Sequence, residues 1–159
     1  HRLGQSADAL TRFDSLSQKP GSYQAEAALG AAEIFLAQDN SQKAKELLDR
    51  ARDAGANNPA YLTMRGRMFL MSGDATAAQA EYNKAIQLDP GYPAAHLENG
   101  LLYVKNKVLS QGLLELQRYL ELVGKDVEGT DKVQMLVDQL QQAMGKNPET
   151  APTATGESK

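Results

Sequence analysis

The feature that most constrains the fold of this chain is a self-similarity with a period of 34 residues. Residues of the same physical kind recur at that interval in five columns, which alternate between small and large side chains. The columns are Phe35, Phe69 and Tyr103; Ala32, Gly66 and Gly100; Ala44, Ala78 and Gly112; Leu48, Tyr82 and Leu116; and, more loosely, Ala51, Ala85 and Tyr119. Five columns in one register are not expected by chance, so the chain is predicted to consist of repeats.

This alternation predicts pairs of antiparallel helices. Two helices approach to roughly 8 Å only where facing positions lack bulk, and the small columns meet that need while the aromatic column fills the remaining space. One such pair cannot bury its apolar face alone, so several pairs must stack on one another. The predicted fold class is therefore all-α.

The middle copy resembles the tetratricopeptide repeat family, which places Gly, Tyr, Ala, Phe, Ala and Pro at set offsets along a helix-turn-helix. Those offsets hold Gly66, Phe69, Ala78, Tyr82, Ala85 and Pro90, with only the aromatics exchanged. The outer copies depart from the pattern at Ala32, Leu48, Ala56, Leu116, Tyr119 and Gly124. The resemblance covers about residues 22–124 and implies a right-handed α-solenoid of three helix pairs that binds other proteins.

The rest of the chain flanks these three copies. Residues 6–18 have helical spacing, which predicts the second helix of a truncated repeat with an open N-terminal edge. Thr130 to Met144 is amphipathic, as a capping helix must be, and the final segment has too few large apolar residues to order itself. The predicted organisation is 1–21 partial repeat, 22–57, 58–91 and 92–124 three full repeats, 125–145 linker and capping helix, and 146–159 disordered tail.

Helix boundaries follow from turn and capping residues. Asn58 and Asp74 are predicted N-caps, because their side chains can accept bonds from unpaired backbone N–H groups. A single helix is predicted over residues 42–54, with Gly55 ending it in the left-handed conformation. Helices are also predicted over 22–38, 93–106 and 108–123, and Gly145 is expected to close the helix that begins at Thr130.

Composition excludes several classes of function. The 17 basic and 20 acidic residues give a net charge of −3 with no clustered basic face, which argues against a nucleic-acid partner. The chain has no cysteine, which removes disulfides, thiolate metal sites and a cysteine nucleophile. No apolar run approaches the roughly 18 residues of a membrane span. The sequence is expected to start inside a longer protein or after a removed segment.

The sequence contains no recognisable catalytic motif. His96 is the one histidine within a predicted helix, and with no second ligand type at metal-binding spacing it is expected to be a surface or packing residue. Glu98 is two residues away and faces another way. No phosphate-binding loop, HExxH or EF-hand motif occurs. The prediction is a protein without catalysis, cofactor or metal.

The resemblance implies that the first helix of each pair lines a concave groove. The matching positions are Leu29, Glu33, Leu36, Thr63, Met64, Arg67, Leu70, Met71, Leu97, Glu98, Leu101 and Lys105. Because this set is largely apolar, the predicted partner is an extended or amphipathic helical protein segment. The stripe of Met64, Met68 and Met71 fits either an adaptable groove or plain core. Arg67 either bonds a ligand or pairs with neighbouring acids.

Family members that grip a chaperone's C-terminal carboxylate use Lys, Asn and Arg at five positions on the first helices. Here the aligned residues are Leu29, Glu33, Met64, Ala94 and Glu98. The carboxylate clamp is therefore absent, and Glu33 and Glu98 would repel a carboxylate.

Two functions remain open. The first is an adaptor that binds a partner segment in the groove. The second is self-assembly, in which the open N-terminal edge stacks on another copy to give a homo-oligomer. By analogy with relatives, the chain suits bacterial envelope, pilus or secretion assembly, although a cytoplasmic adaptor fits nearly as well.

Overall fold

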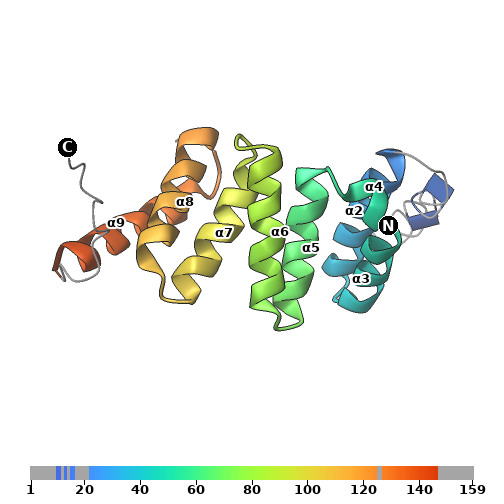
Figure 1. Ribbon diagram of the computed structural model, residues 1–159, viewed down its shortest axis with the longest axis horizontal. Helices are drawn as coiled ribbons and strands as arrows, with labels where there is room; N and C mark the ends of the chain where they lie inside the picture. The colour runs from blue at the N-terminus through green and yellow to red at the C-terminus, as the bar shows by residue number, and fades with distance from the viewer. Residues whose placement is uncertain (1–9, 12, 14, 17–21, 125–126, 147–159) are drawn as a thin grey trace, which may run out of the picture. The chain divides into compact units, whose positions relative to one another are not determined.

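The computed structural model describes residues 10–11, 13, 15–16, 22–124 and 127–146. Every regular element among them is an α-helix (Figure 1), which confirms the predicted all-α class. The chain divides into two compact units, His1–Pro90 and Gly91–Lys159. None of the described helices combines the length and the apolar character that a bilayer crossing requires.

The first unit is built from helices that pack as antiparallel pairs. In chain order they are α2 (Ser22–Ala37), α3 (Ser41–Arg50), α4 (Arg52–Gly55), α5 (Pro59–Met71) and α6 (Ala75–Leu88). Helix α2 packs against α3, and α5 packs against α6. Helix α5 also contacts α2 and α3, so the two pairs form one stack within this unit.

The partial repeat at the N-terminus was predicted as a helix over residues 6–18. Its described residues, 10, 11, 13, 15 and 16, are helical. The ring of Phe13 lies against Gly30 of α2, where an added side chain would collide with it. The remaining residues of the predicted helix lie outside the described part of the chain.

The predicted caps of the second repeat are confirmed. The Asn58 side chain accepts a hydrogen bond from the Tyr61 backbone N–H at 3.1 Å, and Asp74 accepts one from the Ala77 N–H at 2.9 Å. Each satisfies one of the N–H groups that a helix N-terminus leaves unpaired. The local sequence therefore determines where α5 and α6 begin.

A left-handed residue in the turn of each helix pair extends the 34-residue register. Asp39, Gly73 and Lys107 have φ values of 58°, 85° and 62°. Only glycine adopts this conformation without steric cost, yet two of the three positions hold Asp and Lys. The column is therefore not recognisable from residue type. It is a feature of the repeat that the sequence pattern did not predict.

The single helix predicted over residues 42–54 is wrong, because the chain breaks at Ala51 into α3 and α4. The Ala51 N–H is shared between the carbonyls of Leu47 and Leu48, at 3.2 Å each. The Tyr61 hydroxyl donates to the same Leu48 carbonyl. The Leu48 carbonyl therefore accepts from Tyr61 as well as from Ala51 at the point where the helix breaks.

Gly55 has a different role from the predicted left-handed terminator. It is the last residue of α4 and does not have a positive φ. A side chain at this position would collide with the ring of Tyr61. Glycine is needed here for the close approach of α5, not for backbone conformation.

The small and large columns meet as the packing argument predicted. Ala32, Ala44 and Ala78 are each 0% exposed, at the contacts between helices. The ring of Tyr82, which is also 0% exposed, lies directly over Gly66, where a Cβ would collide with it. Small residues on one helix therefore make room for bulky ones on its partner.

Alkaline pH is expected to destabilise the chain through Tyr61. Burial raises the pKa of Tyr61 to about 12, above its ordinary value of 10.0. The unfolded chain then ionises first, so the stability is present below about pH 10 and is lost as the pH rises towards 12. The loss attributable to this group is about 2 kcal/mol by pH 12.

The measurement is urea unfolding of the natural chain and Tyr61→Phe at about pH 8 and pH 11. At pH 8 the natural chain should be more stable by roughly 1 kcal/mol, the net value of one hydrogen bond. That advantage should shrink or reverse at pH 11. An advantage that does not change with pH would contradict the prediction.

The second unit contains one helix pair and the C-terminal helix, namely α7 (Pro93–Lys105), α8 (Leu109–Val123) and α9 (Thr130–Lys146). A Cβ at Gly100 would lie 2.8 Å from Cγ of Leu116, and one at Gly112 would lie 2.6 Å from Cγ2 of Val104. These glycines allow α7 and α8 to pack closely.

Helix α9 occupies the segment predicted to cap the stack. It packs against α8 through a core cluster of Leu116, Val137 and Leu140. The helix runs through Gly145 to Lys146, so the predicted stop at Gly145 is wrong, and Lys146, the first residue of the predicted tail, is helical. The rest of that tail, residues 147–159, lies outside the described residues.

Candidate functional site

The positions predicted to contact a partner all fall on the first helix of a pair: α2 and α5 in the first unit, and α7 in the second. We call them the inner positions. They are Leu29, Glu33 and Leu36 on α2; Thr63, Met64, Arg67, Leu70 and Met71 on α5; and Leu97, Glu98, Leu101 and Lys105 on α7.

Four inner positions are open to solvent. Met71 is 61% exposed and Leu101 is 41% exposed, and both are large apolar side chains. Glu33 and Lys105 are exposed charged residues. A partner could therefore reach apolar and charged groups on α2 and α5 in the first unit, and on α7 in the second.

Two inner positions of α5 are buried, which corrects the prediction for them. Thr63 is 2% exposed and its hydroxyl donates to the Pro59 carbonyl at 2.8 Å, while Met64 is 4% exposed. Met68 is also buried, at 6%. The methionine stripe is therefore core at its first two members, and only Met71 lies at the surface.

The remaining inner positions are half-buried: Leu29, Leu36, Arg67, Leu70, Leu97 and Glu98. Leu97 packs against the core cluster of α8 and α9, so it mainly stabilises the second unit. Arg67 and Glu98 each already take part in an interaction within the structure.

The structure also places an acidic column that the sequence analysis missed. Glu81 on α6 and Glu115 on α8 are 34 residues apart, and each reaches back to the first helix of its own pair. Glu81 lies 3.2 Å from an Arg65 nitrogen, and Glu115 lies 2.6 Å from Nδ1 of His96. The recurrence of Glu at the 34-residue repeat interval is the sequence signal that could have identified these two residues.

His96 was expected to be a surface or packing residue, and its pairing with Glu115 was not predicted. The two residues are 19 positions apart, and the α7–α8 hairpin brings them together. His96 is 5% exposed, which fits the packing role expected for it. The pair joins two helices and does not present a base to solvent.

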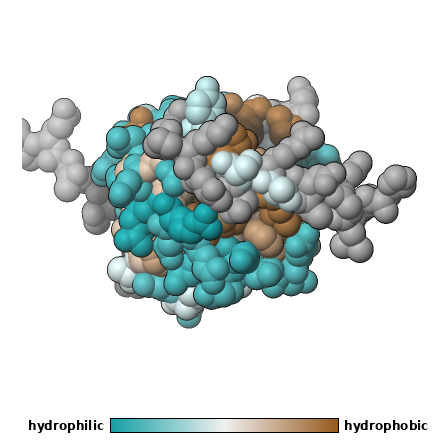
Figure 2. Space-filling view, turned by 90° about the vertical axis from the view of Figure 1, so that its right-hand side faces the viewer, coloured by the Kyte–Doolittle hydropathy of each residue, from teal (hydrophilic) through white to brown (hydrophobic). Residues whose placement is uncertain are grey.

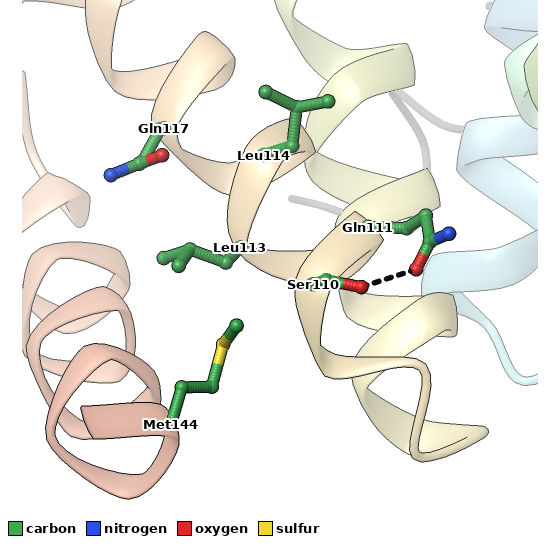
Figure 3. Close-up of a pocket in the computed structure, with 6 residues that line it drawn as sticks. All are labelled: Ser110, Gln111, Leu113, Leu114, Gln117 and Met144. Carbon is green, nitrogen blue, oxygen red and sulfur yellow. Dashed lines mark hydrogen bonds between the residues drawn. The ribbon is translucent and has the colours of Figure 1, made fainter. Parts of the chain in front are cut away.

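The described residues contain no group of three or more His, Cys, Asp or Glu that could hold a metal ion. In the second unit, residues of α8 together with Met144 of α9 line an open pocket of about 320 Å³. Figure 3 shows Leu113 of α8 and Met144 of α9 pointing into this space from opposite sides, while Leu114 points away from Met144. Ser110 and Gln111 at its edge bond to each other at 2.7 Å. None of its lining residues is an inner position.

Two family models match the chain. Residues 2–68 match the model described as Tetratricopeptide repeat, and residues 66–107 match the model described as TPR repeat. Together the two matches span residues 2–107, which is more than half of the 159 residues. Among curated proteins, no sequence matches this chain.

Several solved structures share the fold at low sequence identity. The first TPR of Spaghetti (RPAP3), bound to the HSP90 peptide SRMEEVD, is 19% identical with a TM-score of 0.69, over 79% of this chain and 99% of that one. MamA is 15% identical with a TM-score of 0.71, over 94% and 84% of the two chains. The translocator chaperone SycD of Yersinia enterocolitica is 12% identical with a TM-score of 0.70, over 82% and 92%.

Proposed function

Because this chain belongs to the tetratricopeptide repeat family, we propose that it is a non-enzymatic scaffold that holds a segment of a partner protein against its inner positions. The observation that carries the proposal is the exposure of Met71 and Leu101, two large apolar residues on first helices. Contact with a partner would remove this apolar surface from water, which contributes about 25 cal/mol of binding free energy for each Å² covered.

The residues at the positions that bind a carboxylate in some family members favour a partner different from a chaperone C-terminus. The first TPR of Spaghetti was solved with the peptide SRMEEVD, in which three of the last four residues are acidic. In this chain Glu33 and Glu98 occupy positions where carboxylate-binding relatives have polar or basic residues. Like charges facing each other across an interface are unfavourable, so the proposed partner presents apolar side chains, in an extended or helical segment, and no carboxylate cluster.

Site-specific photo-crosslinking tests the proposal in an extract of the native host. A photoreactive phenylalanine analogue placed at Met71 or Leu101 is expected to give discrete adducts with a partner segment. The matched control is the same analogue at Leu114, an apolar residue on α8 that is 65% exposed and is not an inner position. Adducts that form equally at all three positions, or only at Leu114, would refute the inner positions as the binding surface.

Self-assembly is the second candidate, and one observation favours it. At the N-terminal end of the first unit a cavity of about 310 Å³ is lined by Ala31 and Phe35 of α2 and Leu47 of α3, among other residues. Figure 2 faces this end, where hydrophobic residues are visible among hydrophilic ones. Light scattering at increasing concentration decides between the candidates, because a species that stays monomeric throughout is incompatible with stacking of copies.

The proposal extends to bacterial envelope, pilus or secretion assembly, which rests on analogy with family members that serve such assemblies. Fractionation of the native host with an antibody against the chain tests this part. Recovery of the protein in the cytoplasmic fraction alone would remove the envelope assignment and would leave the scaffold proposal unaffected.

A further inference from the structure

Helix α2 presents a face on which acidic and apolar residues alternate. Glu26, Leu29, Glu33 and Leu36 follow one another at intervals of three, four and three residues, which places them on one side of a helix. Both glutamates are exposed and both leucines are half-buried. We call these four residues the α2 stripe.

The side of α2 that adjoins the α2 stripe is fixed in the core of the first unit. Ala25, Ala28 and Ala32 are 1%, 0% and 0% exposed, so these small residues set the rotation of the helix about its axis. The orientation of the α2 stripe towards solvent is therefore determined by packing. Helix α5, which packs against α2, adds the exposed Met71 as further apolar surface within the same unit.

The two carboxylates have no partner among the described residues. Neither Glu26 nor Glu33 takes part in an ion pair or a hydrogen bond there, and α2 itself contains no lysine or arginine. Other exposed acids of the chain do have partners, since Asp49 lies 3.3 Å from Arg52 and Glu121 lies 3.0 Å from Arg118.

Spacing defines what would complement the α2 stripe. The two glutamates are seven residues apart, which is about 10 Å along a helix, and the two leucines have the same separation. A facing helix with cations seven residues apart and leucine-like residues between them matches both series. An acidic segment would meet like charges and is disfavoured.

We propose that the α2 stripe binds a basic amphipathic segment of a partner protein, with lysine or arginine side chains pairing with Glu26 and Glu33 and apolar side chains packing on Leu29 and Leu36. This inference rests on the proposed scaffold function and specifies the chemistry of the partner. It differs from capture of an acidic C-terminus, because here the scaffold supplies the negative charge.

Three synthetic helical peptides of about 18 residues test the inference. They share one leucine face and differ only in the flanking charged positions, which are lysine, glutamate or glutamine. Binding to the full chain is measured by fluorescence anisotropy up to about 1 mM protein. The lysine peptide is expected to bind roughly tenfold tighter than the other two, because each exposed ion pair contributes a modest amount and two are formed.

The Glu26→Gln/Glu33→Gln variant should remove that preference, and the Glu26→Lys/Glu33→Lys variant should transfer it to the glutamate peptide. The control is Glu46→Gln/Asp53→Asn, which changes the net charge by the same amount at exposed residues of α3 and α4 in the same unit. The control must keep the preference, which separates local pairing from general attraction to an acidic protein. Raising the salt to about 1 M should weaken the preference, because screening then acts within about 3 Å.

Each other outcome has a defined meaning. If the preference survives in Glu26→Gln/Glu33→Gln, or falls equally in the control, the assignment to the α2 stripe is overturned. If all three peptides bind equally and Met71→Asp weakens all of them, the charge inference is overturned while the scaffold function stands. If no peptide binds, the inference is overturned. The scaffold function is then tested separately by the photo-crosslinking experiment.

Discussion

Replacing Tyr82 with alanine is expected to lower the free energy of unfolding by about 3 to 5 kcal/mol, the range measured when a buried aromatic residue is truncated. Tyr82 is 0% exposed, and its ring fills the space that Gly66 leaves between α5 and α6. Truncation removes the apolar contacts of the ring and leaves a cavity that the two helices cannot fully close. Urea unfolding followed by circular dichroism measures the change.

Tyr23→Ala is the control for this variant, because Tyr23 is the same residue type on α2 and is 66% exposed. It should cost less than about 0.5 kcal/mol. The pairing itself is tested with Gly66→Ala, which forces the Tyr82 ring to move and should cost about 1 to 3 kcal/mol in the natural chain. The cost should be smaller when Tyr82 is already alanine. Equal losses from Tyr82→Ala and Tyr23→Ala would contradict the packing described here.

Replacing Arg65 with methionine is expected to cost about 2 to 4 kcal/mol, because it leaves Glu81 without its cation. The two side chains are 16% and 15% exposed and lie 3.2 Å apart, and the guanidinium also lies 5.4 Å from the ring centroid of Phe69. Nε of Arg65 and Oε2 of Glu81 are buried without a hydrogen-bond partner. Breaking the ion pair is therefore costly, although one polar atom on each side chain lacks a hydrogen-bond partner in the intact pair.

The double variant Arg65→Met/Glu81→Leu should recover most of the loss and fall within about 1 kcal/mol of the natural chain, because it removes both charges together. The exposed pair Arg118 and Glu121 supplies the control, and Arg118→Met should cost no more than about 1 kcal/mol. A double variant as unstable as the sum of its single variants would show that Arg65 and Glu81 act independently.

The sequence predicted the elements that depend on local chemistry. The 34-residue register located the helix pairs, and the capping residues Asn58 and Asp74 located two helix starts, because both signals can be read from residue types and their spacing without knowing how the helices pack. The break at Ala51 could not be predicted in this way. At the break the Leu48 carbonyl accepts a hydrogen bond from the Tyr61 hydroxyl, which reaches it from another helix.

The candidate site was predictable only in part, for a related reason. The family pattern identified which helices carry inner positions, but the exposure of each residue depends on how a helix is rotated against its neighbours. Thr63 and Met64 are buried while Met71 is exposed, although all three lie on α5. The pairing of His96 with Glu115 likewise required the hairpin geometry, since the two residues are distant in sequence.

The central claim is that the first helices of the pairs hold the partner segment. Backbone amide chemical shifts of the full chain, recorded with and without the leucine and lysine peptide, test it most directly. The largest changes are expected on α2 and α5, with small changes on α3 and α6. Changes that are largest on α3 or α6, or that are absent at saturating peptide, would contradict it.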